Sequence, residues 1–299
     1  MGVDFTVFTP TYNRAHVLGH SYEALKRQTN KEFVWLIVDD GSTDDTKTLV
    51  DSWIQENAIS IQYIYQENAG KQRAVNTGIK NCSTAYFGFL DSDDYYLPTT
   101  IENFKKHFVE IQDNRRIAGV LARCGKPDGQ ILGNSHIPAG PFVMNFDALY
   151  RSFRFLGDTC RAYRTEILRH FLYPEIEDKF ILESVMLSAI DQEYDLLIVN
   201  KPYSISEYLS DGYTHNSHQL YHKNPLGYAL GISQITISRR GIHRQVKYTV
   251  MYTVWCHVKR LDRPFSQVKN KTMYVLAWPL SCICYFLKWP SWMFRNDAL

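Results

Sequence analysis

Strand and helix patterns alternate through the first hundred residues of this 299-residue chain. Short apolar runs, rich in β-branched and aromatic residues, predict strands at residues 4–10, 32–40, 59–67 and 85–91. Between them, apolar residues at helical spacing predict helices at residues 14–28, 42–57 and 70–82. This order predicts an α/β fold with a mostly parallel sheet covered by helices on both faces. In such sheets, ligands bind beyond the carboxyl ends of the strands.

The rest of the chain has a less regular pattern. Residues 115–134 predict a hairpin that turns at Pro127-Asp128-Gly129. Residues 180–194 predict a helix, and residues 194–209 predict two short strands separated near Pro202. From about Pro225 onward we expect helices, and this part of the chain is also basic.

Acidic residues gather at the ends of two predicted strands. Asp39 and Asp40 end one strand, and Asp91, Asp93 and Asp94 follow another. Because parallel strands end at the same edge of a sheet, these residues are compatible with one shared cleft. Carboxylates suit Mg²⁺ or Mn²⁺, and such a metal neutralises charge on a departing diphosphate. The alternative is a helix start, where the helix dipole also favours acidic residues.

Two further segments place charged residues beside predicted helix starts. Lys71 and Arg73 follow a glycine, where backbone N–H groups and two cations suit a phosphate. A solvated basic helix start is the alternative. In the other segment, Ser42 is predicted to cap a helix whose first turn contains Asp44 and Asp45.

Four segments together resemble the family 2 glycosyltransferases, the large inverting group with the GT-A fold. They read FTPTYNR at 8–14, VDDGSTDDT at 38–46, ENAGKQRAVNTGI at 67–79 and FLDSDD at 89–94, in the family's order and spacing. The resemblance is strong over about the first hundred residues and continues more weakly to about residue 215. It implies a metal-dependent transferase resembling the single-sugar transferases of bacterial surface polysaccharide assembly. The Gln-x-x-Arg-Trp motif of processive synthases does not follow.

The resemblance also implies roles for residues of the donor site. Asp40 would accept a hydrogen bond from uracil N3–H, which favours a UDP-sugar donor. Asp91 and Asp93 would form the Asp-x-Asp pair for Mg²⁺ or Mn²⁺, with Asp93 as the direct metal ligand and Asp91 near the ribose. Asp94 lies outside the minimal pattern and has no assigned role. The remaining residues expected at the nucleotide sugar are Pro10, Thr11, Tyr12, Lys71, Asn76 and Ser92.

An inverting transfer needs a base that deprotonates the acceptor hydroxyl opposite the leaving group. The family supplies an acidic residue at the start of a helix, and the stretch YPEIEDKFILES at 173–184 implies Glu183 in this role. Glu177 and Asp178 compete with it in the same stretch, and Asp158 matches another family position near the acceptor. Without the resemblance, Glu183 would be interpreted as a solvated helix carboxylate.

Charge divides the chain unevenly although its net charge is only +2. Residues 239–299 contain 11 basic and 2 acidic residues, so this segment carries +9 and the first 238 residues carry −7. We predict a GT-A catalytic domain at 1–215, with a nucleotide-sugar-binding half at 1–100 and an acceptor-facing half at 101–215. A basic, aromatic-rich helical region is predicted at 216–299.

Residues 269–295 form the most apolar stretch of the chain. From Met273 to Leu287 this stretch is too short for an ordinary membrane span, and Pro279 interrupts it. Tryptophans and flanking lysines predict a monotopic attachment to anionic lipid at this stretch. The alternatives are a helical pair packed on the protein, or a surface that binds nucleic acid. Nucleic acid is disfavoured because the first part of the chain is acidic.

Membrane attachment of a sugar transferase implies a saccharide acceptor linked to a polyprenyl diphosphate. We therefore expect a peripheral protein at the cytoplasmic face of a bacterial inner membrane. Six cysteines without paired spacing predict neither a zinc site nor a disulfide framework, which favours a reduced compartment.

Two other functions agree with part of the pattern. A nucleotidyltransferase of sugar metabolism also combines a parallel sheet with paired aspartates. It usually has a glycine-rich loop after the first strand, whereas TPTYNRAHVL at 9–18 contains no glycine. A non-catalytic, sugar-nucleotide-binding membrane scaffold is the other alternative. The presence of Asp40, Asp93 and Glu183 argues against it.

Overall fold

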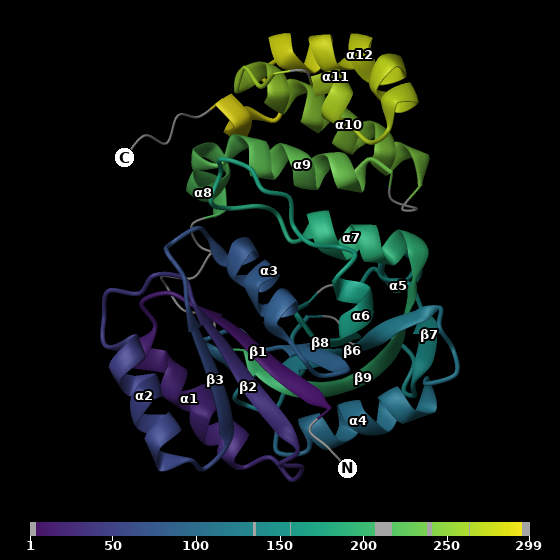
Figure 1. Ribbon diagram of the computed structural model, residues 1–299. Helices are drawn as coiled ribbons and strands as arrows, with labels where there is room; N and C mark the ends of the chain where they lie inside the picture. The colour runs from purple at the N-terminus through teal and green to yellow at the C-terminus, as the bar shows by residue number, and fades with distance from the viewer. Residues whose placement is uncertain are drawn as a thin grey trace. The chain divides into compact units, whose positions relative to one another are not determined.

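The computed structural model describes residues 4–133, 136–155, 157–206, 217–237, 241–262 and 264–294 (Figure 1). The chain divides into two compact units. The first comprises Met1–Leu172 and Glu193–Leu209, and the second comprises Tyr173–Gln192 and Ser210–Leu299. The sequence placed residues 173–192 in the first domain, whereas in the structure they pack with the C-terminal helices.

Four parallel strands form one half of the sheet in the first unit. They lie in the order β3-β2-β1-β4, and their bounds are β1 (Phe5–Thr11), β2 (Phe33–Asp39), β3 (Ser60–Tyr65) and β4 (Tyr86–Phe89). The connecting helices are α1 (Ala15–Lys26), α2 (Thr46–Glu56) and α3 (Lys71–Asn81). The predicted α/β alternation is therefore confirmed.

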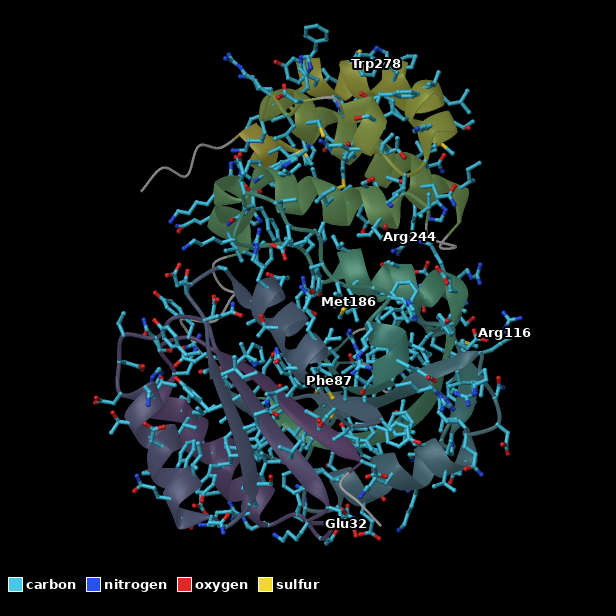
Figure 2. The ribbon with its side chains drawn as sticks, in the orientation of Figure 1. Glu32, Phe87, Arg116, Met186, Arg244 and Trp278 are labelled. Carbon is cyan, nitrogen blue, oxygen red and sulfur yellow. The ribbon has the colours of Figure 1, made fainter. Side chains whose placement is uncertain are left out.

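Helices cover both faces of this parallel half because successive side chains of a strand point to opposite faces. On one face, the ring of Tyr22 in α1 stacks on Trp53 in α2 at 4.4 Å, and Trp35 in β2 lies beneath both. On the other face, α3 lies against Phe8 in β1. Phe8 also stacks at 5.0 Å on the buried Phe87 of β4, which is labelled in Figure 2.

The other half of the sheet is mixed. β8 (Thr159–Arg164) runs antiparallel to β4 and to β6 (Ile117–Gly125), and β6 runs parallel to β9 (Asp195–Ser206). The short strands β5 (Asp94–Tyr96) and β7 (Phe142–Met144) pair antiparallel with β9. The helices of this half are α4 (Thr100–Glu110), α5 (Phe146–Phe153) and α6 (Thr165–Leu168).

Several predicted boundaries in these segments were wrong. The two strands expected at 194–209 are one strand, β9, whose pairing with β6 is irregular near Pro202, where proline cannot donate to the ladder. The expected hairpin turns after Lys126, but an isolated bridge between Gly125 and Ile131 replaces its second strand. The helix expected at 180–194 begins at Ser184.

The described elements of the second unit are all helices, and an irregular segment at 173–183 precedes them. These elements are α7 (Ser184–Glu193), α8 (Ser217–Lys223), α9 (Pro225–Ile235), α10 (Ile242–Val258), α11 (Pro264–Gln267), α12 (Lys271–Phe286) and η1 (Ser291–Phe294). α10 packs against both α9 and α12, and it lies between them in Figure 1. The core of the unit contains the clustered rings of Tyr228, Trp255 and Trp292. None of the helices in the described ranges has the length and apolar character that a membrane crossing requires.

Candidate active site

The predicted donor residues lie at the carboxyl edge of the parallel strands. Thr11 ends β1 opposite Asp39 at the end of β2, and the next N–H, that of Asp40, donates to the Thr11 carbonyl at 2.8 Å. Asp91 follows β4, which pairs with β1 on its other side. The register of three strands therefore brings these residues to one edge of the sheet, as expected for strands that run in parallel.

Asp40 is buried and its carboxylate organises the loop before α3. Oδ1 accepts hydrogen bonds from Gln66 Nε2 at 2.7 Å and Ala69 N at 2.9 Å. Oδ2 accepts from Gly70 N at 2.7 Å and Asn68 Nδ2 at 3.2 Å. A carboxylate offers about four acceptor positions, and these four hydrogen bonds already use them. A uracil N–H would therefore have to share an oxygen with one of these donors or displace it. The uracil contact of Asp40 therefore stays a prediction.

The loop held by Asp40 leads directly to a cation beside the Asp-x-Asp pair. Gly70 precedes α3 with a φ of +102°, and Lys71 is the first residue of the helix. Lys71 Nζ lies 2.9 Å from Asp91 Oδ1 and 3.0 Å from Asp91 Oδ2. Asn76 is buried in the same helix. The N-terminus of α3, a lysine and an aspartate thus meet at one position, where a diphosphate would find both N–H groups and a cation.

The two acidic residues that follow Asp91 have different environments. Burial raises the pKa of Asp93, and the negative charge of Asp91 raises it further. Burial also raises the pKa of Asp94 well above its usual value, and the charges of Asp91 and Asp93 add to this shift. Asp94 accepts a hydrogen bond from Ser206 Oγ at 2.9 Å and is the first residue of β5, paired with β9. Asp94 therefore has a structural role that the sequence did not indicate.

The donor set at Asp91 and Asp93 fits a hard divalent cation. Both groups offer carboxylate oxygens, and a cation would offset the burial and repulsion that raise the pKa of Asp93. In the part of the chain that the structure describes, no three His, Cys, Asp or Glu side chains form a group that could hold a metal. A metal at Asp93 would therefore need ligands from water or from a bound phosphate, as is usual for Mg²⁺.

The nucleoside residues of β1 differ in their exposure. Pro10 and Thr11 are buried, whereas Tyr12 is 48% exposed. The Thr11 hydroxyl is buried and has no hydrogen-bond partner among the described residues. Such a group is rare in proteins and is a natural partner for a ligand at this edge. Ser92, between the two aspartates of the pair, is also buried.

Several residues at this edge have contacts that sequence reasoning missed. Asn13 adopts a φ of +53°, donates from its N–H to Ser42 Oγ at 2.8 Å and accepts from Thr43 N at 2.8 Å. The neighbouring Arg14 is a cation whose charge lowers the pKa of Asp93. Both residues stand in the FTPTYNR segment, and the tolerance of asparagine for left-handed backbone is the one signal that could have indicated a turn there.

The helix predicted at 42–57 begins later than expected, so Ser42 does not cap it, and Asp44 and Asp45 precede its first turn. α2 begins at Thr46 with Asp45 as its N-cap residue, and no acidic residue lies in its first turn. Asp44 Oδ1 accepts from the Thr46 N–H at 3.1 Å, and Asp44 Oδ2 accepts from the Ala15 N–H at 3.1 Å. Asp44 therefore satisfies the first N–H groups of two helices, because its loop passes both helix starts.

Asp158 is the candidate acceptor-side residue in the first unit. It is exposed and directly precedes β8. Because β8 runs antiparallel to β4, the start of β8 lies at the edge where β4 ends, close to Asp91 in the register. Its carbonyl also accepts from Cys124 N at 3.2 Å, which holds this residue to β6.

The other candidate bases belong to the second unit. Glu183 is exposed and directly precedes α7, and its carbonyl accepts from Leu187 N at 3.1 Å, so it lies at a helix start. Asp178 accepts from Gly227 N at 2.8 Å and thereby caps the first turn of α9. Glu177 is exposed. Asp178 thus has a structural contact that accounts for its position.

The sequence model of one protein family, glycosyl transferase family 2, matches residues 6–172, which is more than half of the chain. The chain therefore belongs to the family 2 glycosyltransferases. This membership excludes the nucleotidyltransferase interpretation of its paired aspartates. The match covers the donor residues and Asp158, and it ends before Glu183.

Three curated proteins illustrate how the similarity is distributed. An uncharacterized glycosyltransferase of Rickettsia prowazekii is 34% identical over 120 residues, which are 40% of this chain and 35% of that protein. The glycosyltransferase GlyA of Streptococcus pneumoniae is 38% identical over 36% of this chain and 15% of its own length. The teichoic acid poly(glycerol phosphate) polymerase of Staphylococcus epidermidis is 37% identical over 30% of this chain and 12% of its own. The matches therefore span about a third or less of these relatives.

Solved structures show the same fold at low identity. The structure of Staphylococcus aureus TarS has a TM-score of 0.61 at 18% identity, over 97% of this chain and 50% of that chain. TarS 1–349 with UDP-GlcNAc has a TM-score of 0.56 at 18% identity, over 92% and 79% of the two chains. The mannosyltransferase PcManGT of Pyrobaculum calidifontis, with GDP-Man and Mn²⁺, has a TM-score of 0.52 at 16% identity, over 96% and 75%. The sheet and its helices are thus of the GT-A type.

Proposed function

We propose that this chain is an inverting glycosyltransferase that moves one sugar from a UDP-sugar to a hydroxyl of a saccharide acceptor. The observation that carries the proposal is the meeting of Lys71, at the start of α3, with Asp91 of the Asp-x-Asp pair. Family membership and the TarS complex with UDP-GlcNAc support a nucleotide sugar as donor. The relatives GlyA and teichoic acid polymerase support a role in surface polysaccharide assembly.

In this mechanism the first unit binds the donor through its strand edge. The N–H groups at the start of α3, together with Lys71, contact the diphosphate and favour its negative charge. Thr11 offers its hydroxyl to the nucleoside. Asp93, with Asp91, would hold Mg²⁺ or Mn²⁺, which neutralises charge on the departing UDP when bound. The bound Mn²⁺ of PcManGT supports this assignment.

Glu183 is proposed to accept the proton of the acceptor hydroxyl. Its place before α7 agrees with the helix start at which the family carries its base, and its exposure leaves it accessible to an acceptor. Removal of the proton makes the acceptor oxygen nucleophilic as it attacks the anomeric carbon on the face opposite UDP. Asp158 is the alternative base in the first unit, and Glu177 is the alternative in the second.

We further propose that the acceptor saccharide is linked to a polyprenyl diphosphate. The enzyme would then work as a peripheral protein at the cytoplasmic face of a bacterial inner membrane. The excess of 9 positive charges in residues 239–299 supports an anionic membrane as its partner. Nucleic acid is not proposed as a partner, because residues 1–238 carry a net charge of −7.

The donor assignment is tested with a panel of nucleotide sugars in Mg²⁺ or Mn²⁺, with binding and donor hydrolysis as readouts. We expect UDP-sugars to bind when metal is present. Asp93→Ala should abolish metal-dependent binding and lower transfer by roughly a hundredfold or more. Asp113→Ala, at an exposed aspartate that precedes β6 near the opposite edge of the sheet, is the matched control and should leave both unchanged. Failure of every UDP-sugar to bind in metal would contradict the donor assignment.

The base assignment needs a separate variant. Glu183→Gln should spare UDP-sugar binding and lower transfer by roughly a hundredfold or more, because general-base catalysis contributes on that order. Glu193→Gln, at the exposed last residue of the same helix, is the control. Near-normal turnover of Glu183→Gln would move the base to Asp158 or Glu177.

A further inference from the structure

The helix α12 presents an apolar face that nothing in the described structure covers. Six large apolar residues lie along one side of this helix and its C-cap, over more than two turns, and each is 44% to 81% exposed. We call them the α12 face: Val275, Leu276, Leu280, Ile283, Phe286 and Leu287. Most other exposed large apolar residues of the described chain stand singly, for example Ile54 and Val109. A grouped apolar face of this kind marks an interaction surface.

The α12 face cannot turn inward, because the opposite side of the helix is already packed. Tyr274, Ala277 and Ser281 are buried on that side. The ring of Tyr274 lies 6.2 Å from that of Tyr252 in α10. The ring of Tyr285 lies 4.6 Å from that of His257, also in α10. Within the second unit, α10 thus fixes which side of α12 faces outward (Figure 1).

Cations frame the α12 face, and acidic residues are missing from the surrounding sequence. Lys269 and Lys271 precede it and Lys288 follows it, all three exposed. Residues 264–294 contain no Asp or Glu. Trp278 and Trp289 are 45% and 43% exposed, and Trp278 is labelled on α12 in Figure 2. An apolar strip between lysines, with tryptophan at its border, is typical of a helix that lies in the interface of an anionic membrane.

The length and anchoring of α12 decide how it meets a bilayer. Its 16 residues extend about 24 Å at 1.5 Å per residue. This is shorter than the roughly 30 Å of a hydrocarbon core. One side of α12 also remains in contact with α10. The helix therefore suits a position parallel to the membrane plane, with only the α12 face in the acyl region and its lysines among the head groups.

A second copy of the chain is a poorer partner for this surface. If two α12 faces packed together, the lysines at their ends would meet other lysines, in parallel and in antiparallel arrangement alike. Like charges that approach closely repel each other. Anionic lipid head groups instead supply the opposite charge at both ends of the helix.

We infer that the α12 face is the surface by which this protein docks on an anionic membrane. The inference deepens the membrane attachment proposed above and rests on that part of the proposed function. It does not depend on which sugar is transferred, because its residues lie outside the donor site.

The inference is tested by co-sedimentation of the full chain with phosphatidylcholine vesicles, with or without one third phosphatidylglycerol, at low salt. We expect binding to the anionic vesicles that weakens as salt is added. Leu276→Gln with Ile283→Gln should lower the partition coefficient by about tenfold or more. Ile54→Gln with Val109→Gln, two exposed apolar positions on α2 and α4, is the matched control and should bind like the wild type. Lys271→Gln with Lys288→Gln should weaken binding to the anionic vesicles by about tenfold or more, because each lysine near the surface contributes about 1 kcal/mol, and should leave binding to phosphatidylcholine vesicles unchanged.

Circular dichroism and UDP-sugar hydrolysis verify that the α12 variant is folded and has an intact donor site. Equal vesicle binding by the α12 variant and the wild type would overturn the α12 face as the docking surface while leaving membrane attachment intact. If the wild type ignores anionic vesicles, both the attachment and the surface fail, whereas the transfer assay still decides the proposed activity. Conversion of a wild-type dimer to a monomer by the α12 variant, with vesicle binding unchanged, would identify a second copy as the partner.

Discussion

Neighbouring aspartates in the DSDD segment have distinct partners in spite of their identical chemistry. Asp91 pairs with Lys71 at 2.9 Å, whereas burial and the Asp91 charge raise the pKa of Asp93. Asp94 instead accepts from Ser206 and connects the loop to β9. These differences separate a candidate metal ligand from a structural residue one position away.

The raised pKa of Asp94 predicts a pH-dependent effect on stability. The folded protein binds the proton of the Asp94 carboxyl group more tightly than the unfolded chain does. This group therefore destabilises the fold as the pH rises above 3.8, the ordinary pKa of an aspartate. Asp94→Asn keeps an acceptor for Ser206 without the charge. We expect it to increase the free energy of unfolding at pH 7, by about 1.4 kcal/mol for each unit of pKa shift, and by progressively less toward pH 4.

Urea unfolding of Asp94→Asn and wild type in the presence of EDTA measures this difference across pH. The exposed Asp113→Asn serves as the control and should show no pH-dependent gain. A gain of equal size at pH 4 and pH 7 would show that the charge of Asp94 is not its cause.

Among the elements, the position of α3 at the proposed donor site depends on how closely this helix packs on the sheet. Gly78 faces Phe8 of β1, and a Cβ atom built at Gly78 would lie 2.3 Å from that ring. The contact is possible only because the glycine has no side chain. It sets the position of α3 and therefore that of Lys71 at its first residue.

We expect Gly78→Ala to destabilise the protein by about 1–3 kcal/mol, because the added methyl group overpacks the contact with Phe8. Gly19 in α1 is the matched control, since a Cβ atom there meets nothing within 4 Å. Gly19→Ala should stabilise by about 0.5–1 kcal/mol through helix propensity. Urea unfolding measures both variants, and the same sign for the two would show that packing on Phe8 is not limiting.

At the scale of the whole molecule, the stretch with Glu183 is held by the C-terminal helices of its own unit. A Cβ atom at Gly227 in α9 would lie 1.9 Å from the Phe180 carbonyl oxygen. Asp178 accepts from the Gly227 N–H in the same contact. The C-terminal region therefore supports the segment that carries the proposed base, in addition to presenting the α12 face.

We expect Gly227→Ala to displace this segment and lower transfer by about tenfold or more, since misplaced catalytic groups are costly. UDP-sugar affinity should stay within about twofold, because the proposed donor residues belong to the other unit. Gly140→Ala, where a Cβ atom meets nothing within 4 Å, is the control. Steady-state transfer rates and UDP-sugar binding are measured separately for each variant. A parallel loss of transfer and of binding would indicate general unfolding instead.

The amino-acid sequence was sufficient to predict the order of strands and helices in the first hundred residues and to bring the proposed donor segments to one edge of the sheet. Those features are local, since side-chain periodicity and strand ends can be read over a few residues. It missed the single strand β9, because the pairing that keeps Pro202 inside one strand comes from the distant strand β6.

Contacts formed on folding determine which partner each polar group has and which apolar side of a helix is covered. The bonds of Asp40 to the 66–70 loop, the pairing of Lys71 with Asp91, and the attachment of residues 173–192 to α9 all join distant segments. In α12 the sequence shows apolar residues on every side of the helix. Packing against α10 then buries Tyr274 and leaves Leu276 exposed. Burial depends on neighbours brought by folding, so a local pattern cannot specify it.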